Sequence, residues 1–445
     1  MQSTNISVLV MIFSFCVSTT KSLSIRSTSL GVFKPLSIPI HLKMSSSSSS
    51  QFRISKRTMQ TLDPCVRLMK QIISQHEEKW KDDGIFSLAQ GVVHWKPPKT
   101  AYEALANAAQ ENLDEPTSTT TDGSVIHTYC PDEGYPPLVA ALKVKLEQEN
   151  GLNNPYVMVT SGANQAFVNC AITLLDELDY DNHNHENEHQ QEMISNKCVV
   201  FEPYYFNHVM AIQSIRGGDN CGGTAEAVTN DNDAEGLLVG PTSHGIPDLE
   251  WLRYKLAGSN GIRMVTIVNP GNPTGVSLPH SFLKEVTQLT KEYGVWIVMD
   301  NTYEHFDIHR NNRDAAHHIP YPCFDEEHVI NIFSFSKGYA MAGFRVGYIS
   351  FSSKNGSKGK GTLAYEQMLK VQDTIAICNS RISQMVALGA LEAGREWVND
   401  QVKTLEVGRK AILEAMGSLD EVIGGDGAMY VMGRLPNSTD DKVSE

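Results

Sequence analysis

The stretch SFSKGYAMAGFRVGY (334–348) contains a lysine and an arginine whose neighbours in the sequence are mostly apolar. Lys337 and Arg345 stand eight residues apart among small and aromatic side chains. Lysine is rarely buried without a chemical role, because its charge is costly to remove from water. An ordinary surface loop would be the plain interpretation of this stretch. The chemical interpretation is that Lys337 serves as an amine nucleophile and that Arg345 holds an anion.

Two apolar runs upstream lead into polar side chains that such chemistry needs. The run GVWIVMD (294–300) ends in Asp300, and Tyr303 follows three residues later. Another run continues into NPGNPTG (269–275), whose prolines and glycines fix an unusual turn that presents Asn272. A carboxylate at the end of an apolar run is costly to bury unless it has a partner. We therefore expect Asp300 and Tyr303 to point into one site.

Three further runs lead into groups suited to a flat, phosphorylated ligand. PYVMVTSG (155–162) is followed by a small, polar turn that opens a helix, and the N–H groups at a helix N-terminus bind anions. KCVVFEP (197–203) is followed by YYF, which offers an aromatic face. HVINIFSFS (328–336) contains Ser334 close to its end, just before Lys337.

One cofactor needs this whole inventory, and it is pyridoxal 5′-phosphate (PLP). A lysine forms a Schiff base with its aldehyde. A carboxylate keeps its pyridine nitrogen protonated, which strengthens the electron sink. Serine and arginine hold its phosphate, the arginine as a fixed cation with several donors.

The elements that must position these residues alternate between two types. Five short runs rich in valine and isoleucine, bounded by Gly, Pro, Ser or Asp, are typical of buried parallel strands. The segment LPHSFLKEVTQLTKEYG (278–294) has apolar residues at helical spacing. Alternating strands and helices predict an α/β fold with a mostly parallel sheet flanked by helices. In such a sheet the ligand crevice lies beyond the carboxyl ends of the strands, where the residues above stand.

Four motifs in this order resemble the class I/II aminotransferases of PLP fold type I: SGANQA, NPGNPTG, DNTYEHF and SFSKGYAMAGFRVGY. The resemblance runs from about residue 55 to the C-terminus. The segments SLAQGVVHWKPP (87–98) and YCPDEGYPPL (129–138) look most similar to the plant aromatic and methionine aminotransferases. The resemblance implies a ping-pong transfer of an amino group between an aromatic amino acid or methionine and a 2-oxo acid.

The resemblance also implies roles for single residues. Lys337 would hold the cofactor and later move a proton, and Asp300 would pair with the pyridinium nitrogen. Asn272 and Tyr303 would bond the ring oxygen, and Tyr205 would stack on the ring. The phosphate would be held by Gly162, Ala163, Asn164, Ser334 and Arg345.

Two more positions concern the substrate and a second subunit. Gly91 would line the carboxylate side of the substrate, together with Asn272. Tyr129 would reach the phosphate in the neighbouring subunit, which implies a homodimer. No metal site is expected, because the cysteines form no CxxC pair and the histidines of 179–192 are more typical of a solvated loop.

The resemblance divides the chain after a leader (1–60) into three parts. Residues 61–110 would form the N-terminal segment of the small domain, 111–374 the large PLP-binding domain and 375–445 the rest of an α+β small domain. We expect this last part to be incomplete, because the chain stops at Glu445 before the family's arginine for the substrate carboxylate. Two alternatives stay open: a PLP-dependent C–S lyase or ACC-synthase-like enzyme, which would use the same lysine and aspartate, and a non-catalytic protein of this fold, because that arginine is missing.

Residues 1–60 are typical of a disordered targeting leader. No Asp or Glu precedes Asp63, and an apolar run at 6–17 is followed by a basic, serine-rich stretch. A plastid or another organelle is the expected destination; the alternatives are a secretory signal and a cytoplasmic protein that starts at Met44. The formal net charge of −14 argues against a nucleic-acid partner and an anionic membrane surface.

Overall fold

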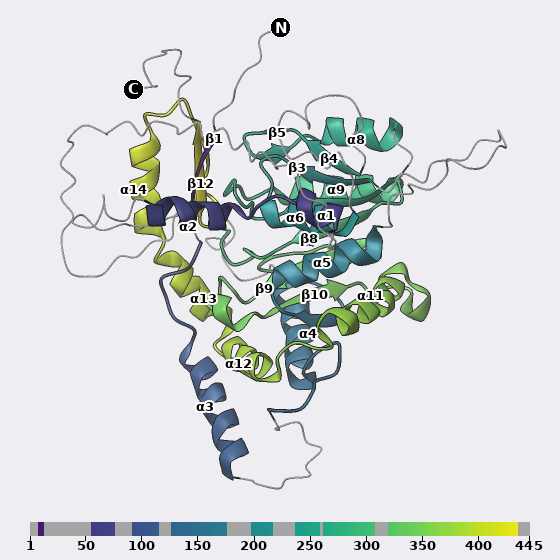
Figure 1. Ribbon diagram of the computed structural model, residues 1–445, viewed down its shortest axis with the longest axis vertical. Helices are drawn as coiled ribbons and strands as arrows, with labels where there is room; N and C mark the ends of the chain where they lie inside the picture. Colours follow the sequence, from purple (N-terminus) through teal and green to yellow (C-terminus); the bar gives the residue numbers. More distant parts are fainter. Residues whose placement is uncertain are drawn as a thin grey trace, which may run out of the picture.

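A seven-stranded sheet forms the centre of the computed structural model, which describes residues 8–12, 55–75, 91–114, 126–175, 197–216, 236–258, 261–307 and 319–434 (Figure 1). The strand order is β2-β10-β9-β8-β7-β3-β4. Neighbouring strands from β4 to β9 run parallel, and β10 alone is antiparallel to both of its neighbours. The strands are β2 (Tyr156–Thr160), β3 (Lys197–Phe201), β4 (Leu237–Gly240), β7 (Ile262–Val268), β8 (Trp296–Asp300), β9 (Val329–Ser334) and β10 (Gly347–Phe351).

The mostly parallel sheet confirms the predicted α/β fold. All five runs that were expected to be buried strands form β2, β3, β7, β8 and β9. The helix expected over 278–294 is α9 (His280–Glu292). Strands β4 and β10 were not predicted.

Helices cover both faces of the sheet because successive strand residues point to opposite sides. In β3, Cys198 and Val200 pack into one apolar cluster, whereas Val199 and Phe201 pack into another. Two helices border the second cluster, namely α8 (Leu249–Gly258) and α9. The first cluster is bordered by α5 (Ala163–Leu174), α6 (Phe206–Arg216) and α11 (Lys360–Ala376).

A second, smaller sheet lies beside the large one, at the left of Figure 1. It is antiparallel in the order β1-β12-β11, so that β1, which falls in the segment expected to be a leader, pairs with β12. Helix α3 packs on α12, where the Gly389 position approaches the carbonyl of Thr100 too closely for a Cβ atom. The strands of this sheet are β1 (Val8–Ile12), β11 (Glu421–Gly424) and β12 (Tyr430–Arg434). The two packed helices are α3 (Lys99–Asp114) and α12 (Arg381–Leu391), and the chain between α12 and β11 forms α13 (Gly394–Lys403) and α14 (Glu406–Met416).

The remaining helices are α1 (Lys56–Gln60), α2 (Cys65–Gln75) and α4 (Pro136–Asn150), and the remaining strands are the short pair β5 (Thr242–Ser243) and β6 (Ile246–Pro247). Across the part of the chain that the structure describes, no helix combines the length and the apolar character that a membrane span requires.

Candidate active site

The carboxyl ends of the central strands bring the predicted site residues to one edge of the sheet. Asp300 is the last residue of β8, and Ser334 is the last residue of β9. Asn272 lies in the loop that follows β7, and Tyr205 lies between β3 and α6. The connection from β9 to β10 carries Lys337 and Arg345, so one loop supplies both cations.

Asp300 is a buried carboxylate with three hydrogen-bond donors. Its Oδ2 lies 3.1 Å from Nε2 of His208, and its Oδ1 accepts from the backbone N–H of Thr302 at 3.0 Å and from the Thr302 hydroxyl at 2.6 Å. Burial alone would raise the pKa of Asp300, but the His208 and Thr302 contacts outweigh it and lower the pKa. The side chain is therefore an anion at neutral pH, as a partner for a pyridinium nitrogen must be.

His208 was not predicted, although it stands in the same segment as Tyr205. Its imidazole is 3% exposed and stacks on Phe167 with ring centroids 4.0 Å apart. The ring also meets Tyr205 edge-on at 5.1 Å. His208 lies on α6, which follows β3, and β3 is two positions away from β8 in the sheet. The spacing of residues in the sequence therefore does not indicate that His208 meets Asp300.

Lys337 lies in a half-buried position with its amine turned towards the N-terminal segment. Its Nζ donates a hydrogen bond to the carbonyl oxygen of Gly91, so the structure brings these two predicted residues together. Burial, together with the charge of Arg345, lowers the pKa of Lys337 to about 8. A sizeable fraction of this amine is then neutral near pH 8, which is the form that attacks a carbonyl group.

The backbone around Lys337 is fixed on two sides. The Trp95 indole N–H donates to the carbonyl of Gly338 at 3.1 Å. A Cβ atom on Gly338 would lie only 2.9 Å from Nδ1 of His305. The lysine therefore stands on a rigid turn rather than on a free surface loop.

The start of α5 lies against the side chain of Arg345. Gly162 precedes the helix with φ +88°, and a Cβ atom there would collide with the Arg345 guanidinium. That guanidinium donates to the carbonyl of Ser161 at 3.1 Å, and Arg345 itself has a left-handed φ of 56°. The exposed guanidinium and the N–H groups of Ala163 and Asn164 at the first turn of α5 together favour an anion.

Tyr303 meets a residue that was not predicted. Its hydroxyl is hydrogen-bonded to the hydroxyl of Tyr430 at the start of β12, and both side chains are buried. Burial raises the pKa of both phenols, so both stay protonated at neutral pH. Tyr430 was missed because the small sheet, and not any nearby motif, delivers it to this place.

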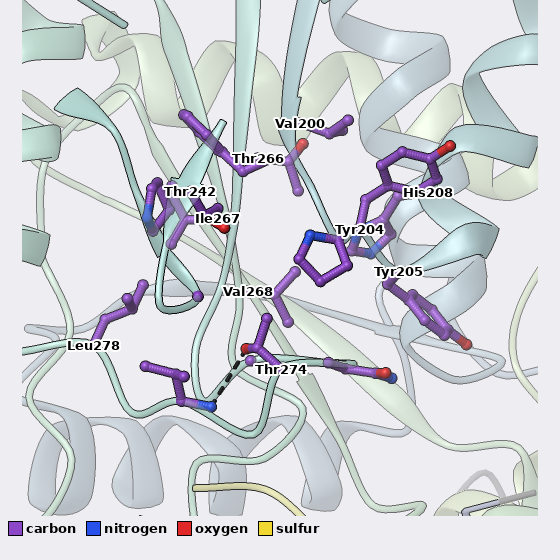
Figure 2. Close-up of a pocket in the computed structure, with 17 residues that line it drawn as sticks. Val200, Tyr204, Tyr205, His208, Thr242, Thr266, Ile267, Val268, Thr274 and Leu278 are labelled. Carbon is purple, nitrogen blue, oxygen red and sulfur yellow. Dashed lines mark hydrogen bonds between the residues drawn. The ribbon is translucent and has the colours of Figure 1, made fainter. Parts of the chain in front are cut away.

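Tyr205 and Asn272 line a pocket that opens at the ends of β3 and β7. Figure 2 shows Tyr204, Tyr205 and His208 on one side of the pocket and Thr242, Ile267 and Leu278 on the other. The Tyr205 hydroxyl accepts from Asn207 at 2.8 Å and lies 3.4 Å from the amide oxygen of Asn164. These contacts hold the ring of Tyr205 in place beside the crevice.

Tyr129 lies on the surface, with 75% of its side chain exposed. Its carbonyl accepts a hydrogen bond from Arg381 at 2.7 Å, which ties this segment to the start of α12. A residue that reaches into a second subunit must be exposed in the single chain, and its role stays a prediction.

A buried charged network supports the loop that carries Tyr303. The Lys145 amine lies 2.6 Å from both carboxylate oxygens of Glu304, and Asn150 donates to Glu304 at 3.0 Å. Next to it, Arg395 of α13 pairs with Glu149 at 3.0 Å. The carboxylates of this cluster already face protein cations, so they do not require a metal ion.

The donor set at the strand ends fits PLP. Asp300 offers a stable anion for the ring nitrogen, and Lys337 offers an amine with a lowered pKa for the aldehyde. The absence of a Cβ atom at Gly162 lets the Arg345 guanidinium lie against the first turn of α5, so that a cation and backbone N–H groups stand together where a phosphate could bind. The anion, the amine and the anion-binding groups therefore match the ring nitrogen, the aldehyde and the phosphate of PLP.

Comparisons with known proteins agree with this chemistry. Residues 96–445 match the family model described as aminotransferase class I and II. An aromatic aminotransferase of Arabidopsis thaliana is 38% identical over 393 residues, which cover 87% of this chain and 83% of that protein. A probable aspartate aminotransferase of Methanocaldococcus jannaschii is 24% identical over 305 residues, covering 68% of this chain and 69% of that protein. The solved structure of Thermus thermophilus aspartate aminotransferase with maleate has a TM-score of 0.64 at 21% identity, covering 86% of this chain and 85% of that one.

Proposed function

The chain belongs to the class I and II aminotransferases and is a PLP-dependent transaminase. From this premise we propose that it moves amino groups between an aromatic amino acid or methionine and a 2-oxo acid. The shared fold confirms the predicted PLP fold type I. The aromatic preference is supported by the name of the Arabidopsis relative. The observation that carries the mechanism is the meeting of Lys337, Asp300 and the Gly162–Arg345 surface at one edge of the sheet.

We propose these roles for the residues of the site. PLP, when bound, withdraws electrons from the α-carbon of the amino acid. Asp300, fixed by His208, holds a negative charge beside the ring nitrogen. Lys337 would hold the cofactor through its amine, and the same amine would accept and return the proton of the α-carbon. Its lowered pKa suits both tasks, because a general base works best when its pKa lies near the working pH.

The other predicted residues bind and orient. Asn272 and Tyr303 provide hydrogen-bond donors for the ring oxygen, and Tyr205 provides an aromatic face. Gly91 lines the substrate side, since its carbonyl faces Lys337. The phosphate contacts are proposed for Gly162, Ala163, Asn164, Ser334 and Arg345.

The family implies amino acid and 2-oxo acid substrates, and we propose a homodimer as well. The exposed side chain of Tyr129 supports it. We also propose two domains, a large one at 111–374 and a small one from 61–110 and 375–445. The packing of α3 on α12 and the presence of two separate sheets support this division. The acid-free, serine-rich composition of residues 1–60 supports an organelle as the destination.

An absorbance spectrum with PLP, followed by product analysis, tests the proposal. The full chain should form a visible band that Lys337→Ala removes. Phenylalanine or methionine should then convert the band to the pyridoxamine form and yield the matching 2-oxo acid. Release of ammonia or a thiol in place of that product would show a lyase, and a chain without any band would show a non-catalytic protein.

A further inference from the structure

Tyr430 reaches the centre of the site from the small sheet. It is the first residue of β12, its side chain is 4% exposed, and its ring meets that of Tyr303 edge-on with centroids 5.3 Å apart. The two hydroxyls are hydrogen-bonded to each other. The titratable groups that face the Tyr430 hydroxyl are Tyr303, Tyr205 and Asp300, so it lies among the residues assigned to the cofactor ring.

The loop that carries Asn272 holds the backbone of Tyr430 in place. Gly275 ends this loop with φ +69°, and a Cβ atom there would collide with the carbonyl of Tyr430. The carbonyl of Gly275 accepts from the N–H of Gly427 at 2.9 Å. The segment before β12 and the loop after β7 are therefore packed as one unit, and the phenol of Tyr430 has little freedom to move away.

The number of protons on the two hydroxyl groups decides which of them donates the hydrogen bond. Each hydroxyl has one proton to donate and two lone pairs that accept. If Tyr303 gives its proton to the ring oxygen of the cofactor, it can only accept from Tyr430. A hydroxyl that accepts a hydrogen bond also becomes a better donor, because the two bonds polarise each other.

We propose that Tyr430 is a positioning residue, which donates to the Tyr303 hydroxyl and so turns the Tyr303 proton towards the cofactor's ring oxygen. This inference rests on the proposed function and adds a residue to it. It assigns to the small sheet a part, exerted through Tyr303, in setting the electronic state of the cofactor.

A pH titration of the visible band of the holoenzyme tests the inference. A donor to the ring oxygen stabilises the deprotonated form, in which that oxygen carries most negative charge, so the loss of the donor raises the apparent pKa of the band. For Tyr303→Phe we expect a rise of about one unit, because a hydrogen bond to a charged group is worth about a tenfold change in an equilibrium. For Tyr430→Phe we expect a rise of about 0.3 unit, because neighbouring bonds strengthen one another by about 10–30%.

The double variant separates positioning from a general structural effect. Adding Tyr430→Phe to Tyr303→Phe should shift the band no further, since Tyr430 acts only through Tyr303. Tyr348→Phe is the matched control, because it also removes a buried phenol hydroxyl but faces Glu304, Tyr339, Glu149 and Cys323 instead. It should leave the titration unchanged.

A second measurement keeps both hydroxyls. Replacing Tyr430 with 3-fluorotyrosine makes the phenol a stronger donor and should lower the apparent pKa of the band. The inference is overturned if Tyr430→Phe leaves the titration of a normal band unchanged, or shifts it equally with and without Tyr303. If wild-type protein forms no band at all, the proposed function fails first and the inference falls with it.

Discussion

The buried pair of Lys145 and Glu304 gives the sharpest test of how the site loop is held. The two side chains are only 6% and 3% exposed, and both N–O distances are 2.6 Å. Glu304→Gln keeps the size of the side chain but leaves the ammonium of Lys145 buried without its counter-charge. Removing one partner of a buried pair costs about 3–5 kcal/mol, so we expect this loss in the free energy of urea unfolding.

The pH dependence gives a second estimate of the same energy. Burial alone would raise the pKa of Glu304, but the charge of Lys145 and its neighbours lowers it from 4.5 to about 2. This difference of about 2.5 units corresponds to about 3 kcal/mol. A carboxylate with a lowered pKa stabilises the fold above its unfolded pKa and ceases to do so as pH falls through the folded one. The gap between wild type and Glu304→Gln should therefore be constant above about pH 5 and shrink towards pH 2.

Two controls make the reasoning refutable. The exposed pair Lys99–Glu103 has the same 2.6 Å separation, so Glu103→Gln tests distance without burial and should not change the unfolding midpoint. Combining Lys145→Met with Glu304→Leu should recover most of the loss, because both charges are gone. The explanation is refuted if Glu304→Gln costs less than about 1 kcal/mol, or if the double variant is no better than the sum of the single ones.

Three further outcomes are expected. Gly162→Ala should weaken PLP binding at least tenfold in a spectroscopic titration, because its backbone conformation costs about 1–3 kcal/mol for a side chain and its methyl group would displace the Arg345 guanidinium; unchanged affinity would show that the cradle lies elsewhere. His208→Phe should raise the pKa of Asp300 and lower kcat more than KM, whereas equal changes in both would argue against an electronic role. The rate at which PLP attaches to the apoprotein should rise between pH 7 and 9 and then level off, because deprotonation of Lys337 occurs at about 8; a rate that continues to rise to pH 10.5 would contradict the lowered pKa.

Most of the site residues that could be predicted from the sequence lie at the ends of the predicted strands. An apolar run followed by a polar residue marks both a buried parallel strand and the crevice at its end, so Asp300, Asn272 and Ser334 could be found with their strands. Lys337 and Arg345 could be found because they share one loop. The structure places these side chains at one edge, and their roles remain proposals.

What could not be predicted comes from long-range packing. His208 and Tyr430 reach Asp300 and Tyr303 from a helix and a second sheet, and no local pattern encodes such a meeting. Strand β10 was missed because its residues read as the end of the lysine motif. The pairing of Lys145 with Glu304 joins positions 159 residues apart, each of which looks like an ordinary charged residue in the sequence.

The antiparallel strand β10 also limits how the length of this chain can change during evolution. Gly347 is paired with Ser334 on one side and with Thr160 on the other. The loop that carries Lys337 and Arg345 therefore begins and ends at a paired residue. A shift of β10 by one residue would turn every side chain of that strand to the opposite face of the sheet. We therefore expect insertions and deletions at other places along the chain, and the polar, turn-rich stretches of this sequence (114–124, 179–192 and 216–236) all lie outside the segment 334–347.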